Sequence, residues 1–189
     1  MKVRILPPQP NPAVPPKVVL VPLGPLPREV LVGAGKALRD VFGPSVVLGA
    51  ALERPEYAFN KDRNQYHSTA ILRRLAQTRR GDTPVLGVVD VDLFQPDAPF
   101  VLGEADRGAG IAVVSVARLA TGPDGKAASP ERLARRLQAE AVHEFGRLLG
   151  LSECQDLRCA MLLSHKATDA DRKGPGLCPA CRNALGTAG

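Results

Sequence analysis

The sequence contains no tryptophan, and aromatic residues account for only 4% of its 189 positions. Its core must therefore be built from valine, leucine, isoleucine and alanine, and a chain of this length can bury one such core. No apolar run reaches the roughly 20 residues of a membrane-spanning helix, and no hydrophobic stretch follows the basic start as in a secretory signal. We therefore expect a cytoplasmic protein with one compact domain and no membrane partner.

Signatures of nucleotide and nucleic-acid binding are also missing. The chain has neither a G-x-G-x-x-G motif nor a Walker loop, so dinucleotide binding has no support. The net charge of +6 and the pI near 9.5 would suit an acidic or nucleic-acid partner. No RNP, helix-turn-helix or aromatic-interleaved basic motif accompanies this charge, which favours a solvated surface. The same alternatives, phosphate contacts or a solvated helix end, apply to Arg73, Arg74, Arg79 and Arg80.

Apolar patterning predicts an α/β domain with a mixed sheet over residues 18–150, after a proline-rich extended arm at residues 1–17. Short apolar runs suit buried strands, and helical periodicity marks the segments between them. The predicted strands are residues 18–24, 45–52, 85–94, 100–103 and 110–119, and the predicted helices are residues 27–42, 62–80 and 129–149. The last two strands form a hairpin whose edge could pair with an extended peptide.

Some polar residues of this region are compatible with either a structural or a functional role. Asp62 and Gln65 suit a capping box at the start of helix 62–80, and His67 nearby is more typical of a cap or surface group than of a ligand. Asp90 and Asp92 point the same way from a strand and would suit a metal or an acid/base pair. No partner residues stand at useful spacing, so we interpret both as acids that face a loop.

The predicted helix 129–149 has defined ends and a polar site near its end. Ser129 can cap it, and Gly150 suits the left-handed conformation that terminates a helix. His143 and Arg147 lie four residues apart and share one face, with Glu144 beside them. The side that faces the core is an apolar stripe made of Leu133, Leu137, Ala141, Phe145 and Leu148.

All the cysteines of the chain follow this helix, as a C-x4-C pair and a C-x2-C pair: Cys154, Cys159, Cys178 and Cys181. Four thiolates at this spacing complete a tetrahedral structural zinc site. Free buried thiols or two disulfides are the alternatives, and an intracellular setting favours the metal. Residues 151–189 are rich in glycine, proline and charge and have little core of their own. We therefore expect zinc to decide whether they fold.

Together these residues form most of one composite motif, H-E-x-x-x-x-x-G-x-x-x-C followed by C-x4-C-x-M and C-x-x-C. It resembles the signature of the archaemetzincins, which are metzincin-like zinc metalloproteases. Similar segments upstream are RNQYHSTAIL, GVVDVDLF and VLGEADRGAGIAVVSVARL, so the resemblance covers nearly everything after the proline-rich arm. The matching residues of the signature are His143, Glu144, Gly150, Cys154, Cys159, Met161, Cys178 and Cys181.

The resemblance implies a metzincin-like fold, with an upper α/β subdomain at residues 18–150 and a small lower subdomain at residues 151–189. The upper part carries the active-site helix, on which Glu144 would be the general base that takes a proton from a metal-activated water. Met161 would form a turn beneath a catalytic zinc that three histidines hold. A second, structural zinc would lie on the four cysteines.

Two positions depart from the signature, because Arg147 and Glu153 stand where the second and third histidine ligands are expected. His143 and Glu153 could each donate to a metal, but a guanidinium has no lone pair to give. A unit positive charge about 4 Å from a divalent ion would cost roughly 8 kcal/mol at an effective dielectric near 20. A catalytic zinc would therefore need another ligand, such as His67 or His165.

We therefore expect one structural zinc, a catalytic zinc that is impaired or absent, and peptidase activity that is weak or lost. We also predict that Arg147 and Glu153 pair with each other in a forked geometry. One alternative is a non-catalytic relative that keeps the cleft and binds a peptide or a protein partner. Another is a nucleic-acid-binding protein that is stabilised by the structural zinc and binds through the arginine clusters.

Overall fold

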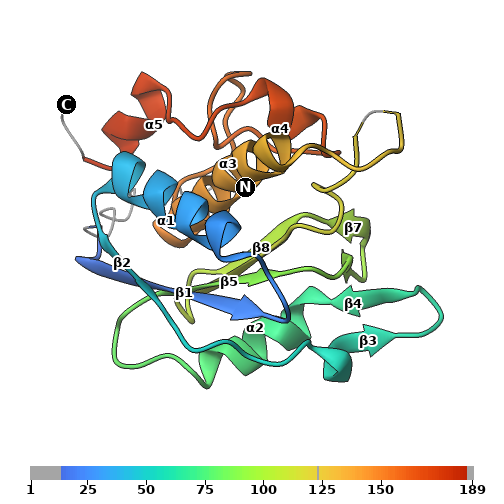
Figure 1. Ribbon diagram of the computed structural model, residues 1–189. Helices are drawn as coiled ribbons and strands as arrows, with labels where there is room; N and C mark the ends of the chain where they lie inside the picture. The colour runs from blue at the N-terminus through green and yellow to red at the C-terminus, as the bar shows by residue number, and fades with distance from the viewer. Residues whose placement is uncertain (1–13, 123, 187–189) are drawn as a thin grey trace, which may run out of the picture.

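A five-stranded mixed sheet lies at the centre of the computed structural model, which describes residues 14–122 and 124–186 (Figure 1). Its strand order is β2-β1-β5-β9-β8, and β8 runs antiparallel to the others at one edge. The strands are β1 (Lys17–Leu23), β2 (Ser45–Leu48), β5 (Val85–Val89), β8 (Gly103–Asp106) and β9 (Ile111–Ser115). The predicted α/β class with a mixed sheet is confirmed.

Helices cover both faces of this sheet, which is why its central strands β5 and β9 are buried at every position. Helices α1 (Arg28–Phe42) and α3 (Pro130–Leu148) pack on one face, and α2 (Ser68–Ala76) packs on the other (Figure 1). Leu86 and Val88 join the core beneath α1 and α3. Their neighbours Val85 and Val89 join the core beneath α2.

A smaller sheet extends beyond β5, with strand order β3-β4-β6-β7. Its strands are β3 (Phe59–Asn60), which follows the short 3-10 helix η1 (Glu56–Ala58), β4 (Gln65–His67), β6 (Leu93–Gln95) and β7 (Ala98–Val101). Strand β7 ends just before β8 begins, so residues 98–106 supply an outer strand to each sheet in turn.

The predicted start of helix 62–80 is wrong, because Gln65–His67 forms β4 and α2 begins only at Ser68. The side chain of Asn60, rather than that of Asp62, accepts from the backbone here. Gln65 donates its side-chain amide to Asp92 and to the carbonyl of Pro99 and makes no capping contact. Long-range hydrogen bonds therefore override the local capping pattern.

The predicted strand 85–94 is also wrong as a single element, since it divides into β5 and β6, which belong to different sheets. Asp90 lies in the turn between them, where its carboxylate is 3.3 Å from Arg54. Asp92 forms a two-point ion pair with Arg118, with distances of 2.6 and 2.8 Å. Both acids have arginine partners, so the structure gives them a role in holding loops.

The tail that follows α3 packs against α1 and α3, on the side away from the sheet (Figure 1). Gly150 has a φ of 89°, the left-handed conformation predicted for it. The tail contains two short helices, α4 (Asp169–Arg172) and α5 (Pro179–Ala184). Its apolar residues join the same cluster as Phe42 and Phe145, so it completes an existing core and has none of its own.

Two sequence predictions concern the ends and the surface of the chain. Most of the predicted arm at residues 1–17 lies outside the described residues, and Lys17 already belongs to β1. Within the described ranges, no helix combines the length and the apolar character that a membrane crossing requires.

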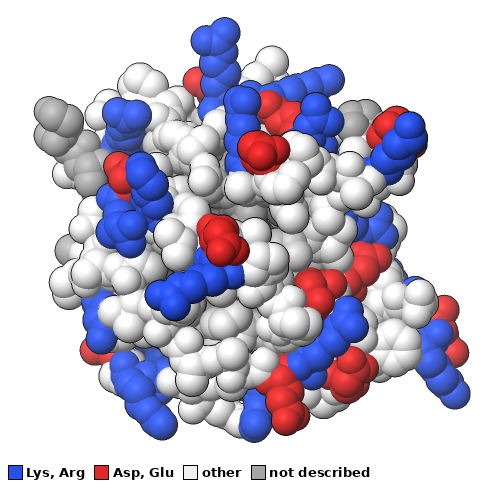
Figure 2. Space-filling view, viewed as in Figure 1, with Lys and Arg blue, Asp and Glu red and all other residues white. Residues whose placement is uncertain are grey.

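On the face shown in Figure 2, basic and acidic side chains are interspersed. Arg79 is used inside the fold, where it donates to the carbonyls of Thr83 and Ala109.

A buried arginine that the sequence patterns did not reveal links α3 to the tail. Arg136 is fully buried, and its guanidinium donates to both carboxylate oxygens of Asp171 at 2.7 Å. It also donates to the carbonyls of Leu119 and Thr121, at 2.7 and 2.6 Å. One side chain therefore joins α3, α4 and the loop after β9.

Arg136→Met should destabilise the protein by about 3 kcal/mol, because removing one partner of a buried ion pair leaves the other groups unpaired. The urea-unfolding midpoint measures the loss. Arg135→Met, an exposed neighbour on the same helix, should change stability by less than about 0.5 kcal/mol. Equal effects of the two substitutions would contradict the structural role of Arg136.

Candidate functional site

The four cysteine sulfur atoms converge in the tail, where they all lie within 4.8 Å of one another. Cys154 and Cys178 are 3.7 Å apart, too far for a disulfide bond of about 2.05 Å. Tetrahedral zinc with bonds of about 2.3 Å separates its sulfur ligands by about 3.8 Å. The four cysteines therefore fit a tetrahedral metal ion, and Cys154, Cys159, Cys178 and Cys181 would hold it.

Backbone groups around the cluster support thiolate ligands. The amide of Asp156 donates to Cys154, and the amide of Cys178 donates to Cys159, both at 3.4 Å. Burial nevertheless raises the pKa of the Cys159 and Cys181 thiols above their ordinary value. A bound metal ion would supply the positive charge that keeps all four sulfur atoms deprotonated.

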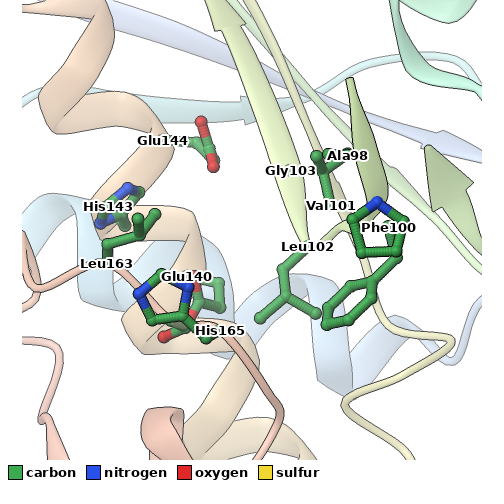
Figure 3. Close-up of a pocket in the computed structure, with 12 residues that line it drawn as sticks. Ala98, Phe100, Val101, Leu102, Gly103, Glu140, His143, Glu144, Leu163 and His165 are labelled. Carbon is green, nitrogen blue, oxygen red and sulfur yellow. The ribbon is translucent and has the colours of Figure 1, made fainter. Parts of the chain in front are cut away.

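A cavity of about 280 Å³ lies beside the middle of α3 and is named the cleft cavity below (Figure 3). Residues 98–103, from β7 and the start of β8, form one wall. Leu163, Ser164 and His165, which follow Met161, form the opposite wall. Helix α3 supplies the floor, with Glu140, His143 and Glu144. The position of these residues along α3 gives the cavity a polar floor, next to a largely apolar wall of residues 98–103 and a mixed wall of residues 163–165.

His143 is held in a neutral form with one defined proton. It is only 3% exposed, and its Nδ1 lies 3.0 Å from the carbonyl oxygen of Ala160. Burial lowers the pKa of His143 to about 4, and the positive charge of Lys173 adds to this effect. A carbonyl only accepts, so Nδ1 carries the hydrogen and Nε2 keeps its lone pair for a ligand or a metal.

Glu144 is buried between α3 and the start of β8 (Figure 3). Its Oε2 has no hydrogen-bond partner within the described chain. Burial raises the pKa of Glu144 to about 8, with the Glu140 carboxylate as a further cause. Position 103 must be glycine for this packing, because a Cβ there would lie 2.7 Å from Oε1 of Glu144 and 2.6 Å from the carbonyl of Val113.

Arg147 and Glu153 lie at the outer end of α3 and are both partly exposed, at 41% and 48% of their side-chain area. They meet through a single contact of 3.4 Å between Nη1 and Oε1. The predicted pairing is present, but the predicted fork is not, because solvent competes for both groups. Neither side chain is buried beside His143 as a replacement for a metal ion.

The remaining candidate ligands do not assemble around His143. His165 lines the cleft cavity, whereas His67 lies in another cavity beside α2. Among the described residues, the four cysteines are the only group of three or more potential ligands close enough to share a metal ion. The residues present therefore do not fit a three-ligand catalytic zinc.

Met161 is fully buried and lies against α3 one turn beyond His143. Its sulfur would be 2.5 Å from a Cβ at Gly146, and its carbonyl accepts from the amide of Cys154 at 2.9 Å. The structure thus places Met161 between α3 and the cysteine cluster.

A buried polar network that the sequence patterns did not reveal connects the walls and floor of the cleft cavity. Lys173 is fully buried, and its ammonium lies 3.1 Å from the Glu140 carboxylate. It also donates to the carbonyls of Ala160 and Leu162, at 3.1 and 2.7 Å. Ser164 donates to the same oxygen of Glu140 at 2.6 Å. Lys173 stands in a glycine- and proline-rich segment, a composition typical of exposed loops. The only sequence feature that pointed to this network was therefore the position of Glu140, three residues before His143 on the same helix.

Comparisons with known proteins agree with this architecture. The model of the family described as "Peptidase family M54" matches residues 35–187. The Archaemetzincin of Methanocaldococcus jannaschii is 34% identical over 169 residues, which cover 89% of this chain and 92% of that protein. The crystal structure of the Archaemetzincin of Methanopyrus kandleri has a TM-score of 0.78 at 33% identity and covers 90% of this chain and 93% of its own.

A third similarity gives the class of protein. The crystal structure of a zinc-dependent peptidase from Methanocorpusculum labreanum has a TM-score of 0.80 at 28% identity and covers 88% of this chain and 99% of its own. The fold is thus shared with a class of zinc-dependent peptidases. Within this class, the chain belongs to peptidase family M54, the archaemetzincins.

Cys178→Ser should abolish metal binding and unfold the tail after Gly150, while the sheet stays largely formed. Three thiolates hold zinc less well than four, and the folding of small zinc-bound segments depends on the metal. Elemental measurement should fall from one zinc per chain to near zero, and limited proteolysis should cut within residues 151–186. A purified wild-type protein that holds no metal, with cysteines that alkylate freely in the native state, would contradict the assignment.

Glu144→Gln should remove a pH dependence of stability. The folded-state pKa of Glu144 is raised to about 8, so the folded protein retains a proton that the unfolded chain has lost. Wild-type stability should therefore fall relative to the variant as the pH rises from about 5 to 8, by about 1.4 kcal/mol for each pH unit. Urea unfolding at several pH values measures this difference. Glu53→Gln, at an exposed position, should behave like wild type, and parallel curves for wild type and Glu144→Gln would contradict a buried neutral acid.

Proposed function

We propose that this archaemetzincin binds peptides in the cleft cavity, holds one structural zinc on its four cysteines, and has weak or no peptidase activity. The proposal rests on the residues that occupy the second and third ligand positions of the family signature. Arg147 and Glu153 meet in solvent at the end of α3, and His143 alone remains as a buried imidazole on the helix.

The chemistry of the remaining groups supports this loss of activity. In the family signature, a zinc ion would lower the pKa of a bound water, and a glutamate would take the proton. Here Glu144 is buried and neutral below about pH 8, so it can donate a hydrogen bond but is a poor proton acceptor. His143 keeps a lone pair on Nε2. A single protein donor does not make a catalytic zinc site, however, because such a site needs three protein ligands.

The surfaces around the cleft cavity support peptide binding. Strand β8 pairs with β9 on one side only and forms an edge of the five-stranded sheet, so its other side offers backbone groups to an added strand. Gly103 opens this edge directly above Glu144. The unpartnered Oε2 of Glu144 could donate to a peptide carbonyl that lies there, since a buried polar group without a partner is costly.

The double substitution Arg147→His with Glu153→His should restore a second zinc per chain and measurable hydrolysis of a fluorogenic peptide. It would return three imidazole donors to the helix and the following turn. Either single substitution should leave the zinc content at one per chain, because two protein donors do not make the site. Elemental analysis and a peptidase assay on all four proteins provide the test.

The wild-type protein is the decisive control for this proposal. It should bind a labelled peptide in a fluorescence anisotropy titration without cleaving it. A wild type with two zincs per chain, one of which disappears in His143→Ala, would show that the catalytic metal persists. Efficient hydrolysis by the wild type would lead to the same conclusion.

A further inference from the structure

A second cavity, of about 390 Å³, lies next to the cleft cavity and is named the basic cavity here. Phe100 and His165 line both cavities, so the two cavities adjoin at these side chains. The other walls come from the loop after β9, with Arg118 and Thr121, and from the segment before α4, with Lys166 and Thr168. None of the residues that line it is an aspartate or a glutamate.

The positive charge of the basic cavity comes mainly from Lys166. Arg118 lies 3.9 Å from the centre of the Phe100 ring, and its charge is offset by the two-point ion pair with Asp92. Lys166 is exposed and forms no ion pair with another residue of the described chain. The hydroxyls of Thr121 and Thr168 add donors beside it. This combination suits a carboxylate, which accepts hydrogen bonds and carries one negative charge.

The cleft cavity favours a different group. Phe100, Leu102 and Leu163 contribute apolar surface to its walls. The Glu140 carboxylate on its floor is already paired with the buried ammonium of Lys173, so it does not attract a second cation. An apolar side chain therefore suits the cleft cavity better than a lysine or an arginine.

The direction of β8 orders the two cavities along a bound peptide. Antiparallel pairing is the more common way to extend a sheet, and β8 runs from Gly103 to Asp106. A peptide added in this way would have its C-terminal end at Gly103 and would continue towards Phe100. It would therefore meet the cleft cavity first and the basic cavity afterwards.

We propose that the peptides bound by this protein carry a carboxylate, held by Lys166 in the basic cavity, shortly after an apolar residue held in the cleft cavity. This inference rests on the proposed peptide binding and adds the chemical class of the ligand. The carboxylate is either the C-terminus of the peptide or the side chain of an aspartate or a glutamate.

The test uses fluorescein-labelled hexapeptides with a single leucine two residues before the C-terminus, titrated in anisotropy measurements at low salt. One pair differs only in a free or amidated C-terminus, and a second, amidated pair carries either aspartate or asparagine after the leucine. A carboxylate should strengthen binding roughly fivefold, the upper range for an exposed charge pair. The pair that responds identifies the source of the carboxylate.

Lys166→Glu should abolish or reverse this preference, because it puts a carboxylate where the ammonium stood. Lys61→Glu makes the same change of charge at an exposed position in the β3–β4 turn and should keep the preference. Binding without any preference for a carboxylate would overturn this inference while the peptide-binding function stands. No binding of any of the peptides would overturn both.

Discussion

The convergence of four cysteine sulfur atoms is the constraint on which the cleft depends. Cys159 and Cys178 enclose the segment that supplies Met161, the wall at Leu163 to His165, and Lys173. This segment contains only the short helix α4, so little regular secondary structure holds its path. A metal ion on the four thiolates contributes about 10–16 kcal/mol in comparable small sites, enough to hold the wall of the cleft against α3.

The network around Lys173 links the segment between Cys159 and Cys178 to α3. One carbonyl oxygen, that of Ala160, receives both the ammonium of Lys173 and the Nδ1 hydrogen of His143. The same ammonium is paired with Glu140 on α3. A buried ion pair of this kind adds little net stability but fixes the geometry of the groups that it joins. The state of His143 therefore depends on residues of the tail as well as on its own helix.

The charged and the neutral groups of this region differ in exposure. Arg147 and Glu153 meet in solvent at the end of α3. The groups that stay buried, His143 and Glu144, are both neutral near pH 7 because burial disfavours their charged forms. The floor of the cleft therefore presents two buried neutral groups beside the Glu140–Lys173 ion pair.

The sequence by itself determined the elements whose pattern is local: the apolar strands β1, β5 and β9, the helix with Ser129 at its start and Gly150 at its end, and the spacing of the four cysteines. It also determined the family, because the signature is read from the spacing of residues along one stretch, from His143 to Cys181. The tertiary structure decided what depends on distant partners. Gln65 contacts Asp92 and Pro99 across two strands, which turned a predicted helix start into β4, and the turn at Asp90 divided one predicted strand between two sheets. Burial of Arg136 and Lys173 also required the folded tail, since each is satisfied by carbonyl and carboxylate oxygens that only the fold brings together.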